Sequence, residues 1–132
     1  ALVALNAWAF VRLNLSMQPA ELHEFFKHYG LVPARYSDPL AAAALGAGNA
    51  FVPFFSSMFL HGGLMHFLGN MWTLWIFGDN VEDRLGKFRY LLFYLLCGTV
   101  AALIQTYLVP RSGVPMVGAS GAIAACGNSS SR

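Results

Sequence analysis

The sequence His61-Gly-Gly-Leu-Met-His66-Phe-Leu-Gly-Asn70 opens an apolar stretch that continues to Phe77 and carries polar side chains within it. A helix is expected over residues 64–78, with His61 just before it. His66 and Asn70 stand at positions i and i+4, which places them on one helix face, about 40° apart. Because polar groups inside a membrane helix are costly, each of these side chains needs a partner or a function.

The spacing alone leaves two interpretations of this face open. His66 and Asn70 can hydrogen-bond to neighbouring helices as packing contacts, or they can serve chemistry. A metal site is not expected, because His61 and His66 would lie about 140° apart around one regular helix. His61 is expected to pack or cap at the start of the helix.

The composition predicts a membrane protein. Of the 132 residues, 57% are hydrophobic and only 11% are charged, whereas soluble domains carry about 25% charged residues. A lipid bilayer is therefore the expected environment. The net charge of +2 without a basic run argues against a nucleic-acid partner. Cys97 and Cys126 stand in apolar surroundings and are expected to pack, not to form a disulfide or to bind metal.

The expected fold is an all-α polytopic membrane bundle, with three spans and the start of a fourth in this chain. The first helix covers about residues 1–16 and is truncated, and a long outer loop follows over 17–56. This loop either carries short amphipathic helices at the membrane surface or is an ordinary solvated loop. The second helix covers 64–78, the third 88–109, and the fourth begins at 118–126. The third has 22 residues, or about 33 Å, which is enough to cross a hydrocarbon core of about 30 Å.

Basic residues predict the orientation of these helices. Arg84, Lys87 and Arg89 cluster between the second and third helices, and cytoplasmic connections carry an excess of lysine and arginine. The long first loop and the start of the fourth helix are therefore expected to face outward. Ser120 would then lie near the outer side of the bilayer.

A second motif, Gly118-Ala-Ser120-Gly121, stands at the expected start of the fourth helix. A serine between small residues at a loop-to-helix junction exposes its hydroxyl. Its backbone N–H faces a developing anion from a helix N-terminus. Alone the motif is weak, because small-residue runs are common at membrane helix contacts.

Three blocks in order resemble the rhomboid family of intramembrane proteases. They are His61-x4-His66-x3-Asn70, Val81-Glu-Asp-Arg-Leu-Gly86 and Gly118-Ala-Ser-Gly121. The segment Ser57 to Gly63, ahead of the second helix, is similar to bacterial and organellar members. The resemblance extends over essentially the whole chain.

The resemblance implies a role for each matching residue. Ser120 would be the nucleophile, and His66, Asn70 and the Ser120 backbone N–H would form the oxyanion hole. The remaining residues would be structural: His61 supports the hole, Glu82, Arg84 and Gly86 hold the second and third helices in register, and Gly118 and Gly121 flank the serine.

The resemblance further implies hydrolysis of transmembrane protein substrates through a serine–histidine dyad, with no cofactor and no metal. Rhomboids take the dyad histidine from a later helix, and no histidine follows Ser120 here. We therefore expect the N-terminal portion of a protease, inactive as it stands, in a bacterial inner membrane or an organellar membrane. The alternatives are a catalytically dead rhomboid-like protein that binds membrane proteins, and a small transporter or channel. The second alternative lacks intramembrane acids for a polar path.

Overall fold

The computed structural model describes residues 2–120, and this part of the chain is helical without a β-strand. The expectation of an all-α fold is thus confirmed for these residues. An isolated β-bridge joins Leu31 to Met116. The elements are α1 (Leu2–Ser16), α2 (Pro19–Tyr29), α3 (Ala34–Ser37), α4 (Pro39–Leu45), α5 (Ala47–Ala50), α6 (Val52–Ser56), the 3-10 turn η1 (Ser57–Phe59), α7 (Leu64–Leu85) and α8 (Lys87–Leu108).

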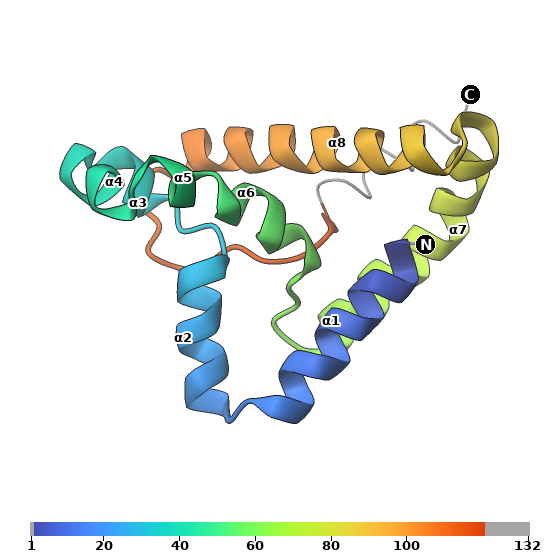
Figure 1. Ribbon diagram of the computed structural model, residues 1–132, viewed down its shortest axis with the longest axis horizontal. Helices are drawn as coiled ribbons and strands as arrows, with labels where there is room; N and C mark the ends of the chain where they lie inside the picture. The colour runs from blue at the N-terminus through green and yellow to red at the C-terminus, as the bar shows by residue number, and fades with distance from the viewer. Residues whose placement is uncertain (1, 121–132) are drawn as a thin grey trace.

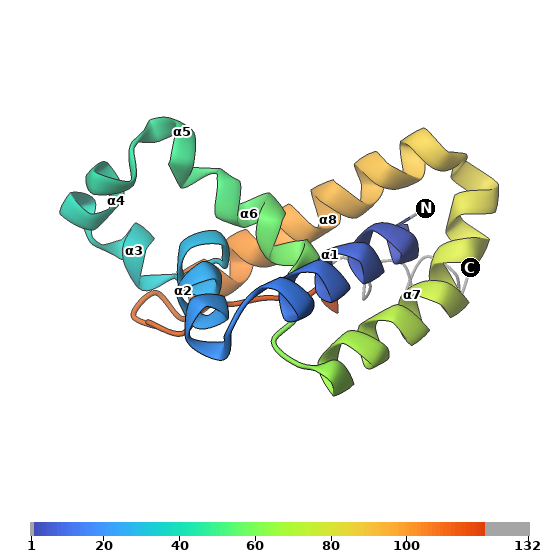
Figure 2. The same ribbon diagram turned by 60° about the horizontal axis from the view of Figure 1, so that its bottom comes forward.

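Helix α1 packs against α7 in the opposite direction, as both ribbon views show (Figures 1 and 2). The rings of Phe10 and Phe67 stack with centroids 4.3 Å apart and planes inclined by 7°. At the other end of α1, Leu2 is buried in the same core cluster as Leu74. The two helices therefore form one apolar layer, to which α8 adds Tyr90 and Tyr94.

The turn between α7 and α8 consists of one glycine. Gly86 has φ +77°, a conformation that side chains with a Cβ rarely adopt. Its N–H donates to the Glu82 carbonyl over 2.8 Å, which ends α7. Gly78 of α7 packs directly against the phenol of Tyr90 on α8, where a Cβ would collide with the ring. Glycines thus allow both the sharp turn and the close approach of the two helices.

The second helix extends further than the sequence suggested. It was expected to end at residue 78, but α7 continues to Leu85. Val81 is 4% exposed and packs in the core, so burial continues on one face of the helix. The polar residues around it, among them Asp79 and Asp83, lie on exposed faces of the same helix. These charged residues therefore belong to the exposed end of the helix and not to a loop.

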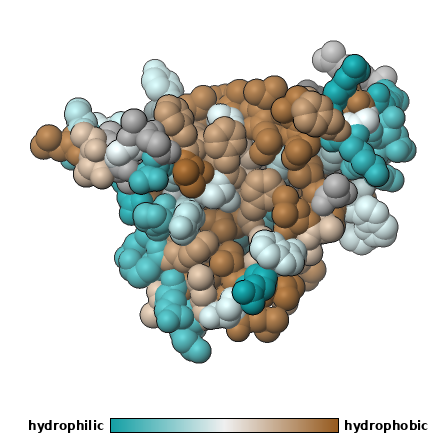
Figure 3. All heavy atoms as spheres, viewed as in Figure 1, coloured by the Kyte–Doolittle hydropathy of each residue, from teal (hydrophilic) through white to brown (hydrophobic). Residues whose placement is uncertain are grey.

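Within residues 2–120, α8 is the one helix that is both long and apolar enough to cross a membrane, judged by length and composition. Helix α1 is apolar but has 15 residues, or about 22 Å, which is less than a hydrocarbon core of about 30 Å. The space-filling view shows apolar side chains over α8 and the centre of the molecule (Figure 3). Polar side chains gather at the α7–α8 turn and over α2.

The expected long loop over residues 17–56 is built mainly from the short helices α2 to α6. Pro19 and Pro39 stand in the first turns of α2 and α4, where a missing N–H is tolerated. Asp38 accepts a hydrogen bond of 2.9 Å from the Leu40 N–H and so caps α4. Short helices in this segment are confirmed.

Candidate active site

The segment that leads from α8 to Ser120 is held against the first loop along its length (Figure 1). At its start, Ser37 Oγ donates to the Pro110 carbonyl over 2.7 Å, and the Ala34 N–H donates to the Ser112 carbonyl over 3.0 Å. Further along, Leu31 and Met116 exchange backbone hydrogen bonds of 3.1 and 2.7 Å. At its end, the Gly118 N–H donates to the Ser57 carbonyl over 2.8 Å. These contacts fix the path of the segment before it reaches the serine.

Gly118 lies directly against the two polar side chains of α7. A Cβ added to Gly118 would lie 2.7 Å from both Cε1 and Nε2 of His66, and 3.3 Å from Nδ2 of Asn70. The residue also has φ +116°, where side chains with a Cβ are strained. Only glycine therefore fits here. The structure brings the histidine–asparagine face and the serine motif together from segments about fifty residues apart in sequence.

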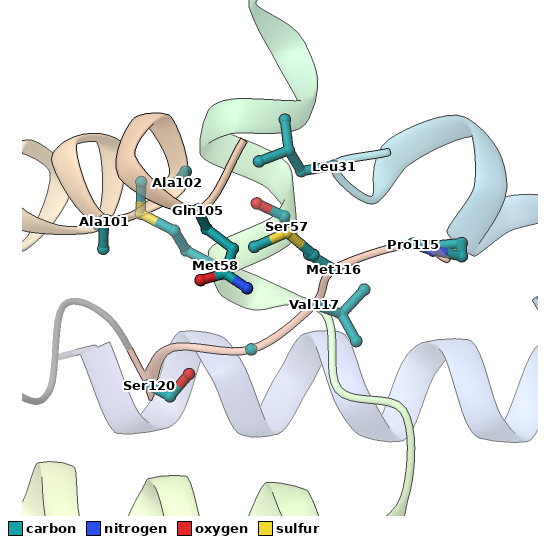
Figure 4. Close-up of a pocket in the computed structure, with 12 residues that line it drawn as sticks. Leu31, Ser57, Met58, Ala101, Ala102, Gln105, Pro115, Met116, Val117 and Ser120 are labelled. Atoms are coloured by element: carbon teal, nitrogen blue, oxygen red, sulfur yellow. The ribbon is translucent and has the colours of Figure 1, made fainter. Parts of the chain in front are cut away.

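Ala119 and Ser120, the two residues after Gly118, lie in different surroundings. Ala119 is 1% exposed and belongs to the apolar cluster that contains Leu2 and Met58. Ser120 is exposed and lines a cavity of about 440 Å³. Figure 4 shows its side chain on the cavity side, across from Met58. Burial of the alanine thus presents the serine hydroxyl to the open space.

The opposite wall of this cavity is formed by small residues of α8. Gly98 packs against the Met58 side chain so closely that a Cβ would overlap it. Ala101 and Ala102 also line the cavity, and Gln105 adds an amide that lies beside Met58 (Figure 4). Small side chains on α8 leave the space that Ser120 faces.

The amide of Asn70 is buried without a hydrogen bond to another described residue. Asn70 is 8% exposed, and its Nδ2 has no acceptor within residues 2–120. A buried donor without a partner is unfavourable. An unpaired buried donor beside the backbone that precedes an exposed serine can receive an oxyanion.

The two histidines of the motif differ in environment. His66 is exposed, with Nε2 beside Gly118. His61 is 2% exposed, and its ring meets those of His66 and Phe67 edge-on, with centroids 5.5 and 5.4 Å away. Burial, together with the neighbouring His66, lowers the pKa of His61 to about 4. A neutral His61 can therefore pack behind His66 at neutral pH.

The model of the Rhomboid domain family matches residues 48–129, which is more than half of the chain. The chain belongs to the rhomboid family. It is 34% identical over 125 residues to the putative rhomboid protease YdcA of Bacillus subtilis, covering 89% of this chain and 62% of that protein. It is 39% identical over 74 residues to Rhomboid-like protein 11, chloroplastic, of Arabidopsis thaliana, covering 56% and 26%.

A third relative is the mitochondrial presenilin-associated rhomboid-like protein of Bos taurus, 33% identical over 73 residues, with 54% of this chain and 19% of that protein covered. The chain thus spans less than two thirds of each of these relatives. These relatives are chloroplast, mitochondrial and bacterial rhomboids by name and source. No solved structure matches the chain.

The second rhomboid block lies away from the serine, at the far end of α7. Glu82 lines a cavity of about 160 Å³ together with Asp79 and Tyr90, Arg84 is exposed in the last turn, and Gly86 forms the turn into α8. Their proposed function in helix register stays a prediction. Gly121 and most of the expected helix 118–126 lie outside the described residues.

Sequence reasoning missed the residues that position the serine motif. The Ser57 carbonyl holds Gly118, and the bridge between Leu31 and Met116 aligns the preceding segment. These contacts use backbone atoms, so side-chain identity gave no signal for them. The small residues Gly98 and Ala102 of α8 are visible in the sequence, but small residues are common in membrane helices.

Proposed function

We propose that this rhomboid chain carries the nucleophile and the oxyanion hole of an intramembrane serine endopeptidase whose substrates are transmembrane proteins. One observation carries the proposal: Gly118 packs against His66 and Asn70, two residues before Ser120. The serine hydroxyl, an unpaired amide donor and a cavity then lie within one small region.

In the proposed reaction, Ser120 Oγ forms a bond to the carbonyl carbon of the scissile peptide, and its proton passes to a base. The carbonyl oxygen becomes an oxyanion, which accepts hydrogen bonds from Asn70 Nδ2, a ring N–H of His66 and the Ser120 backbone N–H. The oxyanion then reforms the carbonyl as the C–N bond of the peptide breaks, and the leaving amine takes the proton from the base. Water then hydrolyses the acyl-enzyme. Neutral donors suit this site because they add no net charge within the membrane.

The base of this dyad would come from residues outside these 132. The chain has four histidines, His23, His28, His61 and His66, and all precede Ser120. His66 is the one beside the serine motif, but its proposed role is to donate to the oxyanion. An unactivated serine hydroxyl is a weak nucleophile, so the proposal requires a further histidine.

The proposed membrane arrangement uses α7 and α8 as spans and α1, whose 15 residues cover only part of the bilayer, as part of the span that precedes them. Arg84, Lys87 and Arg89 at the α7–α8 turn would face the cytoplasm by the positive-inside rule. The first loop and Ser120 would then face the outer side of a bacterial inner membrane or an organellar membrane.

The experiment that tests the proposed function is Ser120→Ala in the full-length protein. Cleavage of a transmembrane reporter in liposomes should be abolished, while circular dichroism and membrane insertion stay unchanged. Ser16→Ala is the matched control, because Ser16 is exposed at the end of α1. Retained turnover in Ser120→Ala would remove this serine as nucleophile.

A second candidate function is binding of membrane proteins without cleavage, as a catalytically dead rhomboid-like protein. The intact Ser120, His66 and Asn70 argue against it. Labelling of the full-length protein by a fluorophosphonate probe separates the two functions. A protease is labelled at Ser120, and a binding protein without an activating base is not.

A further inference from the structure

One polar side chain outside the site is completely buried. Asn6 of α1 is 0% exposed. Its Nδ2 donates to the Leu2 carbonyl over 2.9 Å, one turn earlier in the same helix. Its Oδ1 has no hydrogen bond within residues 2–120. A buried acceptor of this kind is unfavourable unless a donor reaches it.

Two contacts define how α1 and α7 lie against each other. Phe10 stacks on Phe67 near the end of α1. Near its start, Leu2 lines a cavity together with Leu74 and Gly78. The helices run in opposite directions (Figures 1 and 2). Residues of α1 between the two contacts can therefore be matched with the residues of α7 that lie opposite them.

Asn6 lies four residues from each of the two contacts on α1, and therefore on the same helix face. On α7 the corresponding contacts are made by Phe67 and Leu74. Asn70 lies between these two residues in sequence and is also buried. The two asparagines thus stand at the same level of the α1–α7 interface. One has an unpaired acceptor and the other an unpaired donor.

We propose that Asn6 is a positioning residue for the oxyanion hole. Asn6 Oδ1 accepts one N–H of the Asn70 amide through a single bridging water. The second N–H of Asn70 then faces Gly118. The inference rests on the proposed function, and it assigns to α1 a part in the site that sequence analysis gave only to α7 and the serine motif.

The chemical reason lies in the symmetry of an amide. Rotation of the Asn70 side chain by 180° exchanges its NH₂ group for its oxygen, with little change in shape. The rotated amide would present a lone pair to the oxyanion and would repel it. An acceptor fixed at Asn6 favours the orientation in which Nδ2 lies beside Gly118, before any substrate arrives.

A matched control lies in the same helix. Asn14 also donates through Nδ2 to a carbonyl one turn earlier, that of Phe10, over 2.8 Å. Unlike Asn6, it is exposed. Asn14→Leu removes the same type of bond within α1 without touching the interface.

The test compares Asn6→Leu and Asn14→Leu in the full-length protein with a transmembrane reporter. Asn6→Leu should lower kcat about tenfold with KM within about twofold, because the acceptor acts on the transition state. Asn14→Leu should leave both unchanged. In an Asn70→Ala background, Asn6→Leu should have no further effect on kcat. If the leucine variant does not fold, Asn6→Ala replaces it.

Wild-type kcat in Asn6→Leu, or the same fold-loss with and without Asn70, would overturn the inference. A second measurement is independent of turnover: the ¹⁵N and ¹H resonances of the Asn70 side-chain amide should shift in Asn6→Leu and not in Asn14→Leu. If Ser120→Ala retained turnover, the proposed function would fail, and this spectrum alone would decide whether Asn6 contacts Asn70.

Discussion

Replacement of Gly118 by alanine places a methyl group against the two polar side chains of α7. The new Cβ would lie 2.7 Å from His66 Nε2 and 3.3 Å from Asn70 Nδ2. Carbon atoms in contact prefer about 3.5–4.0 Å, so the His66 ring must move by about 1 Å. The backbone at φ +116° would be strained at the same time.

The backbone strain and the displacement of His66 affect different quantities, folding stability and turnover. Backbone strain at a position that favours glycine costs about 1–3 kcal/mol of folding stability. A displacement of about 1 Å in a catalytic group costs about 10²-fold in rate. Gly118→Ala should therefore lower the melting temperature and, independently, reduce turnover per folded molecule about 100-fold.

The assay is reporter cleavage in liposomes, normalised to folded protein, together with thermal unfolding. Gly46→Ala is the control, because Gly46 has φ +73° but no atom within 4 Å of an added Cβ. It should lose stability and keep its turnover. Wild-type turnover in Gly118→Ala, or an equal loss in Gly46→Ala, would refute the role of this contact in the site.

Three further predictions concern the same region. His66→Ala and Asn70→Ala should each slow turnover by about 10²–10³-fold, as loss of an oxyanion donor does; wild-type rates with altered thermal stability alone would favour the packing interpretation. The 132-residue chain should not be labelled at Ser120 by a fluorophosphonate, whereas a version extended through six helices should be; strong labelling of the short chain would imply an activator within it. Because the pKa of His61 falls from 6.5 to about 4, the folded state favours its neutral form, so stability should be complete above about pH 6.5 and decrease as the pH drops toward 4. His61→Phe should flatten this decrease in melting temperature, and an unchanged pH profile would contradict it.

Helix positions could be predicted from the sequence because they follow from apolar runs. The shared face of His66 and Asn70 could be predicted because it follows from helical periodicity. Bounds of the third helix agreed within one residue, 88–109 against Lys87–Leu108. The end of α7 could not be predicted from charge, because Val81 continues the buried face between exposed polar residues. Gly86 then ends the helix through its own backbone conformation.

The contact between the serine motif and α7 was expected only from the resemblance to rhomboids, since spacing left the packing interpretation open. Two features of the structure explain why. Gly118 reaches His66 through a backbone conformation with positive φ. Many glycines in membrane helices do not have a positive φ, so the residue type alone does not predict this contact. The Oδ1 of Asn6 is buried without a hydrogen bond in the described part of the chain because α1 packs on neighbouring elements, α7 among them. Composition does not contain this tertiary arrangement.

Hydrogen bonds from the first loop hold the segment that leads to Ser120. Ser120 is exposed, and its side chain makes no hydrogen bond with another residue of the described part, 2–120. Its position follows from Ala119 in the core and from Gly118 on the Ser57 carbonyl. The bridge from Leu31 to Met116 fixes the approach to that point. Each of these hydrogen bonds alone contributes about 0.5–1.5 kcal/mol to folding stability. Together they hold the segment in one conformation. The distance between Ser120 and the proposed oxyanion donors therefore depends on the first loop as well as on the helix that carries His66 and Asn70.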